Sequence, residues 1–333
     1  MMNFYTLTPD QQVARLQELA AKALLHWDLP HADVSPVELR ENAVFKISLD
    51  GTAKYALRVH RYAYHSDAAL NSELVWIRAL EQHGIDVPQV VPTNRGALFI
   101  SLKSSGVPEP RQVDLFEWIE GQQLGEATSN LNDDEALARI YVAVGEITAR
   151  LHNQAVRWAP PTGFTRHRWD VEGLTGENPV WGRFWEHPEL NRSEKALILL
   201  SRDRIRSDLL RFGVSDDNFS LIHSDLLPEN VLVQGDRLRV IDFDDTGFGW
   251  HLYDLATTLA DYRGKHKDVL KRNSLIDGYQ RIRELRDEHI AHLDLFSLAY
   301  DFDEDDLKQA KQIVKKVHPD RSGLDKKYFI FFF

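Results

Sequence analysis

Residues 221–256 read LIHSDLLPENVLVQGDRLRVIDFDDTGFGWHLYDLA, and this stretch decides the fold that we expect. A short apolar run leads to Asp225, and a loop then leads to Asn230. Two further apolar runs flank a turn at Gly235, and Asp242 follows the second of them. Because this pattern is typical of paired strands, we expect a hairpin with the three polar side chains near one end.

Those three side chains suit phosphoryl transfer from ATP. That reaction has a loose transition state, so the protein mainly positions an acceptor hydroxyl and holds Mg²⁺ on the phosphates. A carboxylate can orient the hydroxyl and take its proton, whereas Mg²⁺ prefers oxygen ligands and keeps several waters. We assign Asp225 as the base or orienting group, and Asn230 and Asp242 as metal ligands. The alternative is a surface hairpin with solvated acids that acquired this spacing by accident.

The segment resembles the aminoglycoside phosphotransferase and choline kinase family, a branch of the protein-kinase-like fold. The catalytic loop of that family, H-x-D-x-x-x-x-N, is matched by His223, Asp225 and Asn230, and its metal-binding Asp is matched by Asp242. The resemblance implies an α+β, two-lobed fold with a small, mainly antiparallel N-lobe and a larger helical C-lobe. It also implies an enzyme that uses ATP and Mg²⁺. Asp254 matches a residue that braces the catalytic loop in this family, although it can also serve as an N-terminal acid of its own helix.

The resemblance divides the chain into three parts. Residues 1–120 are expected to form a nucleotide-binding N-lobe that begins with an amphipathic helix over 9–27. Residues 121–292 are expected to form a C-lobe with the catalytic loop and the acceptor site. Residues 293–333 form a helical tail of a different character.

One expected ion pair lies in the N-lobe. The strand over 55–60 places Leu57 and Val59 on one face and Arg58 on the other. Arg58 matches the family's phosphate-contacting lysine, and arginine also binds phosphate. Glu73 borders the apolar stripe of a helix, where a carboxylate is costly unless it is paired. Arg58 is the expected partner, as in kinase-like folds; the alternatives are an exposed arginine and a solvated glutamate.

Two further segments are assigned to the nucleotide by resemblance. The loop that covers the nucleotide would be residues 41–45, which contain no glycine and therefore no glycine-rich phosphate cradle. The hinge would be Phe116, Glu117, Trp118 and Ile119, whose backbone groups would line the adenine pocket. A simple edge strand is the alternative for the hinge.

Composition excludes several classes of protein. A chain of 333 residues without cysteine has no disulfide framework, thiol nucleophile or cysteine zinc site. A formal charge of −11 argues against a general nucleic-acid binder, which needs a basic face. No signal peptide and no apolar run of roughly 20 residues are evident, so we expect a cytoplasmic protein without a membrane partner.

The acceptor is left open by the sequence. Amino alcohols, aminoglycosides, homoserine-like amino acids and protein Ser/Thr side chains all present hydroxyls. The segment over 157–185 is rich in Trp, Pro and Gly and has no repeat. Its aromatic rings either bind a cationic amine or pack an irregular insertion.

The tail resembles the first half of a J-domain, the module that stimulates the ATPase activity of Hsp70. An amphipathic helix is predicted after the acidic residues at 303–306, and His318, Pro319 and Asp320 follow it. Half of that module is absent from this stretch, so an extension of the C-lobe is the alternative interpretation of the tail. The alternative function is therefore a nucleotide-binding pseudoenzyme or an Hsp70-linked adaptor that acts through this tail, although the complete set of Asp225 and its partners argues against an inactive site.

Overall fold

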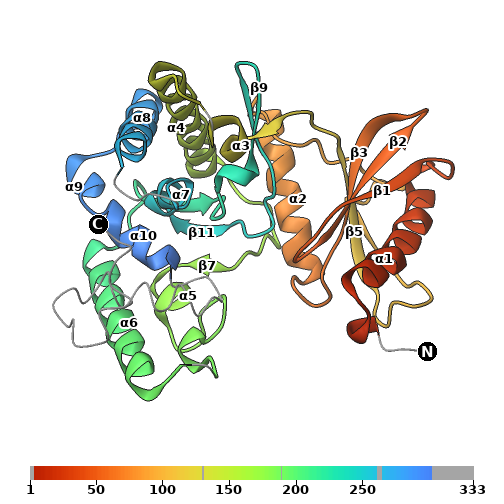
Figure 1. The fold of residues 1–333 in the computed structure, drawn as a ribbon, viewed down its shortest axis with the longest axis horizontal. Helices are drawn as coiled ribbons and strands as arrows, with labels where there is room; N and C mark the ends of the chain where they lie inside the picture. The colour runs from red at the N-terminus through yellow and green to blue at the C-terminus, as the bar shows by residue number, and fades with distance from the viewer. Residues whose placement is uncertain (1–3, 130, 189, 261–264, 302–333) are drawn as a thin grey trace. The chain divides into compact units, whose positions relative to one another are not determined.

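The computed structural model describes residues 4–129, 131–188, 190–260 and 265–301. The chain divides into two compact units, which we call the first and second units. The first comprises Met1–Gly121 with Pro160–Thr165, and the second comprises Gln122–Ala159 with the chain from Arg166 onward. An antiparallel sheet dominates the first unit and helices dominate the second, which confirms the predicted α+β, two-lobed kinase-like fold class (Figure 1).

The first unit is built on a five-stranded antiparallel sheet with the order β1-β2-β3-β5-β4. Its helices and strands are α1 (Pro9–Ala23), β1 (Asp33–Leu39), β2 (Ala43–Leu49), β3 (Thr52–Val59), α2 (Asp67–Gln82), β4 (Phe99–Leu102) and β5 (Arg111–Glu117).

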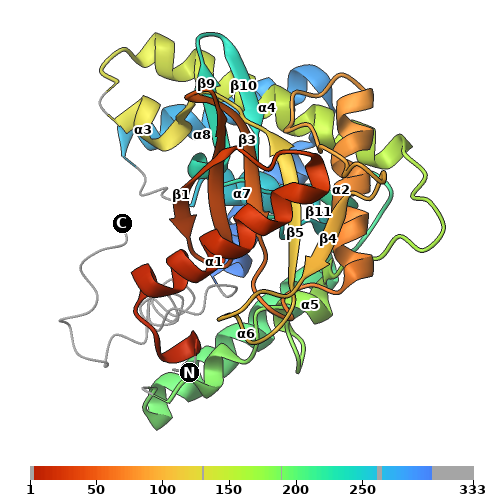
Figure 2. The ribbon, with the colours of Figure 1, turned by 90° about the vertical axis from the view of Figure 1, so that its right-hand side faces the viewer.

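The two helices of the first unit lie on opposite faces of its sheet (Figure 1). Helix α1 crosses the sheet in Figure 2 and packs its Leu19 against a core that includes Phe45 and Leu57. Strand alternation places Arg58, between Leu57 and Val59, on the face that α2 covers. One face of the sheet therefore carries the apolar core, and the other carries a buried cluster of charges.

The sequence prediction for the first unit needs two corrections. The helix expected over 9–27 is present, but its last turn, Leu24–Trp27, is a 3₁₀ helix. The segment expected to cover the nucleotide over 41–45 is not a loop throughout, because Ala43 already begins β2 and pairs with Val59. The connection between β1 and β2 is therefore a short hairpin turn, and only the first two of those five residues belong to it.

The second unit contains two three-stranded sheets surrounded by helices. The strand orders are β10-β9-β6 and β7-β11-β8. Its helices and strands are β6 (Gln122–Gln123), α3 (Leu124–Ser129), α4 (Asp134–Arg157), β7 (Arg168–Trp169), α5 (Val171–Thr175), α6 (Arg192–Phe212), β8 (Phe219–Ile222), β9 (Val231–Gln234), β10 (Arg237–Val240), β11 (Gly247–Trp250), α7 (His251–Thr258), α8 (His266–Ile282), α9 (Asp287–Ile290) and α10 (Leu293–Asp301).

Two glycines allow α4 and α8 to lie side by side with their backbones in contact (Figure 1). A Cβ atom added at Gly145 would lie 2.1 Å from the carbonyl oxygen of Leu275, and one at Gly278 would lie 2.0 Å from that of Val142. Neither distance is possible for a real side chain. This close crossing positions the later turns of both helices, which carry His152 and Tyr279.

The start of the tail belongs to the second unit. Helix α10 packs against α6 and α7, and Phe296 and Ala299 are fully buried. The predicted acidic helix start and His318, Pro319 and Asp320 lie outside the described residues. Among the helices that the structure describes, none is long and apolar enough to cross a membrane.

Candidate active site

The catalytic loop follows β8 as the sequence predicts. Asp225 lies just beyond that strand, and Asn230 ends a 3₁₀ turn at Pro228–Asn230. The Asn230 side-chain amide donates to the Asp225 carboxylate at 2.7 Å and to the Asp225 carbonyl at 2.8 Å. The structure thus joins the proposed base to a proposed metal ligand. Since the Asn230 nitrogen faces Asp225, its side-chain oxygen is directed elsewhere and remains suited to a cation.

His223 is a brace within this loop. Its Nε2 donates to the carbonyl of Ile241 at 2.9 Å, and its Nδ1 accepts from the backbone N–H of Asp225 at 3.3 Å. Burial lowers the pKa of the ring, against the opposing charge of Asp254 and the Ile241 hydrogen bond. A neutral ring with both nitrogens engaged holds Asp225 in place and has no proton to exchange with a substrate. The resemblance placed His223 among the catalytic residues of the loop, and in the structure its geometry is that of a positioning residue.

Asp254 lies behind the catalytic loop, on helix α7. One carboxylate oxygen accepts from the backbone N–H of Ser224 at 2.7 Å, and the other accepts from that of His223 at 3.0 Å. Complete burial raises the pKa of Asp254 to about 6, although His223 and the two backbone donors oppose the rise. The bracing geometry that the resemblance implied is present, and it holds Ser224 in a left-handed conformation with φ of 68°. A non-glycine residue in that region is strained unless neighbouring groups hold it there.

A buried hydrogen-bond chain supports Asp254 from α4 and α8. The Nε2 of His152 donates to Asp254 at 3.0 Å, and the hydroxyl of Tyr279 donates to the Nδ1 of His152 at 2.8 Å. Burial and then the charge of Arg283 hold the pKa of His152 well below its usual range, so the ring is neutral. His152 is therefore structural and acts through Asp254.

The loop that carries Asp242 is anchored to the catalytic loop at both ends. The backbone N–H of Ile241 donates to the carbonyl of Asn230 at 2.9 Å, which places Asp242 one residue from that pair. Asp242 itself has φ of 60°, another left-handed residue at this site. Further along, the hydroxyl of Ser224 donates to the carbonyl of Asp245. The three residues Asp225, Asn230 and Asp242 thus come from two loops that are hydrogen-bonded to each other.

The residues of the two loops fit a magnesium ion in their chemistry. Among the described residues there is no group of three or more His, Cys, Asp or Glu side chains that could hold a metal alone. Asn230 and Asp242 offer one amide oxygen and one carboxylate. Mg²⁺ is commonly held by one or two protein ligands together with waters and substrate phosphates. The site therefore suits a metal that arrives with its nucleotide.

The predicted ion pair in the first unit is confirmed, and it is part of a larger cluster. The guanidinium of Arg58 lies 2.6 Å from Glu73 and 2.8 Å from Asp114, and its Nε also donates to Asp114 at 3.2 Å. His60 lies 2.9 Å from the same Asp114 carboxylate. The side chains of Glu73 and Asp114 are fully buried. Burial favours a raised pKa for Asp114, but the charges of Arg58 and His60 and their hydrogen bonds outweigh it and lower the pKa to about 2.

Two backbone donors of the predicted hinge are already engaged within the protein. The N–H of Glu117 donates to Gln89 at 2.9 Å, and that of Trp118 donates to Lys54 at 2.9 Å, so neither is available to adenine. Phe116 lies within β5, and its ring stacks under the guanidinium of Arg58 at 5.2 Å. Phe116 and Glu117 therefore belong to the sheet.

Ile119 is the remaining donor of the predicted hinge. Its N–H has no hydrogen-bond partner among the described protein groups. It is the backbone donor in this segment that a ligand can use.

The tryptophan-rich segment is mostly packing. Trp169 is 1% exposed and stacks on Tyr253, with ring centroids 5.9 Å apart. Trp185 is buried under the guanidinium of Arg202 at 4.6 Å. The interpretation as an irregular packed insertion is therefore correct for these two rings.

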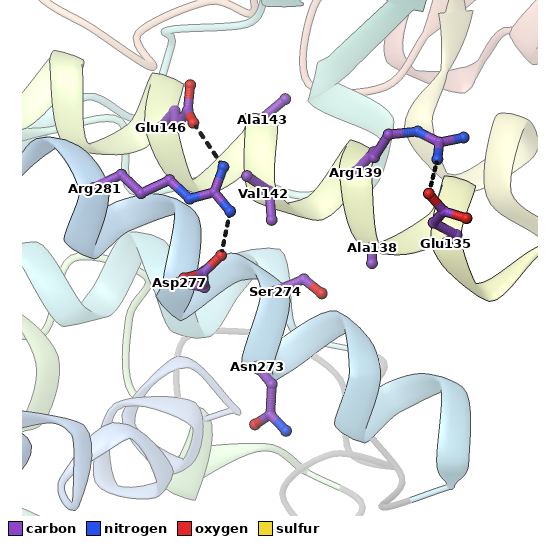
Figure 3. Close-up of a pocket in the computed structure, with 10 residues that line it drawn as sticks. All are labelled: Glu135, Ala138, Arg139, Val142, Ala143, Glu146, Asn273, Ser274, Asp277 and Arg281. Atoms are coloured by element: carbon purple, nitrogen blue, oxygen red, sulfur yellow. Dashed lines mark hydrogen bonds and ion pairs between the residues drawn. The ribbon is translucent and has the colours of Figure 1, made fainter.

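A groove between α4 and α8 has a volume of about 610 Å³ but contains no predicted site residue. Figure 3 shows its charged side chains paired with one another: Arg281 reaches Glu146 at 3.5 Å and Asp277 at 2.7 Å, and Arg139 reaches Glu135 at 3.0 Å. These pairs satisfy the charges that line the groove and leave it without a distinctive ligand chemistry.

Sequence reasoning missed three groups: Asp114 in the charge cluster of the first unit, and Tyr279 and Arg166 behind the two loops of the second unit. Asp114 stands within the apolar strand run QVDLF, and an acid at such a position is a signal for a buried partner. Tyr279 and Arg166 carry no such local signal. Arg166 donates through its guanidinium to the carbonyls of Asp244 and Thr246, in the loop that carries Asp242.

Three relatives illustrate what the chain is similar to. The homoserine kinase of Rhizobium johnstonii is 28% identical over 239 residues, which are 68% of this chain and 65% of the relative. A microcompartment-associated aminopropanol kinase of solved structure is 29% identical, with a TM-score of 0.75, covering 92% of this chain and 99% of that one. An amicoumacin kinase solved with AMP-PNP, Ca²⁺ and Ami is 20% identical, with a TM-score of 0.73, covering 96% and 92%, and this likeness concerns the fold alone. The chain spans about two thirds of the length of the curated relatives it matches, 67% and 65% for the first two.

The family itself is shown by a match that covers most of the chain. The model described as "Phosphotransferase enzyme family" matches residues 33–289. This range covers most of both units and every residue that we assigned to catalysis, nucleotide or metal, and it ends before the segment that resembles a J-domain. The chain therefore belongs to the phosphotransferase enzyme family, as the resemblance of its catalytic loop to the aminoglycoside phosphotransferase and choline kinase group predicted.

Proposed function

We propose that this protein transfers the γ-phosphoryl group of ATP, with Mg²⁺, to the hydroxyl of a small molecule that also carries an amine. One observation carries the proposal: the hydrogen bonds between Asn230 and Asp225 join a metal-ligand amide to a carboxylate, beside the loop of Asp242. A carboxylate and an amide oxygen that meet in this way suit in-line phosphoryl transfer. Membership of the family supports the reaction class.

In the proposed reaction Asp225 accepts a hydrogen bond from the acceptor hydroxyl and takes its proton as the bond from the acceptor oxygen to the γ-phosphorus forms. The bond between the γ-phosphorus and its bridging oxygen breaks, and ADP leaves with that oxygen. Asn230 holds the Asp225 carboxylate, and His223 holds the Asp225 backbone. A carboxylate oxygen that accepts from Asn230 retains lone pairs, and the second oxygen offers more, so a substrate hydroxyl can be bound at the same group. Mg²⁺ would be held by Asn230 and Asp242 and would neutralise charge on the phosphates.

The nucleotide would use groups of the first unit. Arg58, whose guanidinium is held by Glu73 and Asp114, would contact a phosphate, and the Ile119 N–H would donate to adenine. The amicoumacin kinase structure, which contains AMP-PNP and Ca²⁺, supports a nucleoside triphosphate with a divalent cation.

The acceptor class rests on the relatives' names. Homoserine and aminopropanol each join a hydroxyl to an amine in a small molecule, and these are the named substrates of two of the relatives. We therefore propose an amine-bearing alcohol in preference to a protein serine or threonine.

The test is ADP release from Mg-ATP against a panel of acceptors: aminopropanol, homoserine, an aminoglycoside and a serine-containing peptide. The Asp225→Ala variant should lower kcat by on the order of 100-fold or more, because it removes the proton acceptor and the orienting group. Asp236→Ala is the matched control, since it removes an exposed Asp from the turn of the neighbouring hairpin and should leave kcat unchanged. Near-wild-type turnover in Asp225→Ala would contradict the assignment, and release that occurs only with the peptide would contradict the acceptor class.

A further inference from the structure

A four-residue segment is hydrogen-bonded to the loop that carries Asp242. We call residues 166–169, which act through Arg166, His167 and Trp169, the loop brace. Arg166 donates to the carbonyls of Asp244 and Thr246. His167 and Trp169 lie at 2.8 Å and 2.9 Å from the carbonyl of Asp245 and bind it through their ring nitrogens. Three successive carbonyls of one loop are therefore held by side chains of one short segment.

The backbone geometry keeps the loop brace in register. Strand β7, at the end of the brace, pairs in parallel with β11, with Phe248 opposite Arg168. A Cβ atom at Gly247 would lie 2.8 Å from the His167 carbonyl oxygen, and one at Gly249 would lie 3.1 Å from the Cβ of Trp169. The approach of the two segments therefore leaves almost no freedom to slide. The brace and the chain that follows the Asp242 loop behave as one packed piece.

The same loop is tied to the catalytic loop. The hydroxyl of Ser224 donates to the Asp245 carbonyl, the carbonyl that His167 and Trp169 also bind. Ser224 stands next to Asp225, and its backbone N–H is held by Asp254. The brace thus fixes the loop of Asp242 at a point that also contacts the neighbour of the proposed base.

Arg166 is only 7% exposed, so its guanidinium needs hydrogen-bond partners within the protein. A buried guanidinium is costly unless its donors are satisfied, and an apolar side chain would pack there at lower cost. The guanidinium, however, binds the two carbonyls through two separate nitrogens, Nε and Nη2, and neither an apolar side chain nor the single nitrogen of a lysine can reproduce this. The hydrogen-bond geometry therefore accounts for an arginine at this position.

From these contacts we infer that Arg166 is a positioning residue for the metal site: with His167 and Trp169 it sets the place of Asp242 without touching substrate. The inference rests on the proposed function, because it assigns Asp242 to the metal. Groups that orient metal ligands usually change metal affinity or activity by roughly 10- to 100-fold when they are removed. Removal of the Arg166 fork should therefore weaken the divalent metal while the chain remains folded.

The experiment measures binding of Mn²⁺, as a magnetic probe for Mg²⁺, to the full chain with ADP by electron paramagnetic resonance. Arg166→Met should raise the Kd for Mn²⁺ on the order of 10-fold, and Arg166→Lys should fall short of restoring it. The matched control is Arg168→Met, two residues along the same segment. Arg168 is exposed, pairs with Asp170 and contacts none of the three carbonyls, so its loss should leave the Kd unchanged.

A second measurement separates positioning from folding. Amide hydrogen exchange should rise in the loop over 242–247 of Arg166→Met and remain at the wild-type level in α4 and α8. Trp169→Phe, which keeps a ring and removes the donor to Asp245, should give a smaller change of the same kind if the brace acts through these hydrogen bonds.

Each outcome decides a different question. Unchanged Mn²⁺ affinity in Arg166→Met, or an equal loss in Arg168→Met, would overturn the role of the brace. Failure of the wild-type protein to bind Mn²⁺ with ADP would instead overturn the proposed function. Binding that is lost in Asp242→Ala and weakened in Arg166→Met would support both.

Discussion

Replacement of Asp114 by Asn is the sharpest test of the charge cluster in the first unit. Asp114 is fully buried and its pKa is lowered from 3.8 to about 2, because Arg58 and His60 outweigh the effect of burial. At roughly 1.4 kcal/mol for each tenfold change in proton affinity, this lowering corresponds to about 2 kcal/mol of folding free energy. Asp114→Asn should therefore reduce the free energy of unfolding at pH 7 by about 2 kcal/mol.

The pH dependence distinguishes this electrostatic loss from a packing defect. A carboxyl group whose pKa is lowered in the folded state contributes its full stability above its unfolded pKa, near 4, and loses it as the pH falls through about 2. The difference between wild type and Asp114→Asn should therefore be constant from pH 5 to 7 and should shrink between pH 4 and 2. Urea unfolding followed by circular dichroism across this range measures it. Glu117→Gln, an exposed acid on the same strand, is the control.

Coupling between Asp114 and Arg58 gives an independent check. Because Arg58 donates to Asp114 through two nitrogens, Arg58→Lys should cost more stability in the wild type than in the Asp114→Asn variant. Contacting pairs of this kind couple by roughly 0.5–3 kcal/mol. A stability loss in Asp114→Asn that does not change with pH, together with additive effects of the two substitutions, would refute this account of the cluster.

Two further predictions concern the second unit. Burial raises the pKa of Asp254 to about 6, so ionisation of this group lowers the free energy of unfolding of the wild type as the pH rises from 4 to 6. Asp254→Asn should remove this trend, so its free energy of unfolding, measured with urea, should gain about 3 kcal/mol relative to wild type between pH 4 and 7. A difference between the two proteins that does not change with pH would contradict this account. Gly145→Ala should lower stability by about 1–3 kcal/mol or more, because its Cβ would lie 2.1 Å from the Leu275 carbonyl oxygen. Gly125→Ala, whose Cβ would meet its nearest neighbour at an ordinary 3.6 Å, is the control, and equal losses in the two variants would argue against the tight helix crossing.

The parts of the fold that follow from local pattern could be predicted from the sequence. The catalytic hairpin was predictable because its strands, turn and polar ends lie within one stretch, so neighbours in sequence are neighbours in space. The Arg58–Glu73 pair was also predictable. Strand alternation puts Arg58 on the face opposite Leu57 and Val59, and Glu73 borders the apolar stripe of its helix, so each charge needs a partner. Both predictions need only the spacing of apolar and charged residues along a single strand or helix.

The parts that were missed depend on pairing between distant segments. Asp114 faces Arg58 because β5 pairs with β3, and this register cannot be read from either strand alone. Strand β1 at Asp33–Leu39 has a different reason for lacking a clear sequence signal, since its residues are largely exposed and show no regular alternation. The loop brace lies in a segment of Trp, Pro and Gly without period, so Arg166 had no pattern to mark it.

The contacts of Arg58 explain why an arginine, and not a lysine, suits position 58 of this chain. A lysine is a compact point charge, and one carboxylate such as Glu73 can neutralise it. An arginine has a planar fork, and in this chain one edge of the fork is occupied by Asp114 through Nε and Nη2, while Nη2 also meets Glu73. The two hydrogen bonds to Asp114 therefore fix the plane of the guanidinium. We expect Arg58→Lys to be tolerated best when position 114 is neutral. With Asp114 present, a lysine would leave this buried carboxylate with too little positive charge near it.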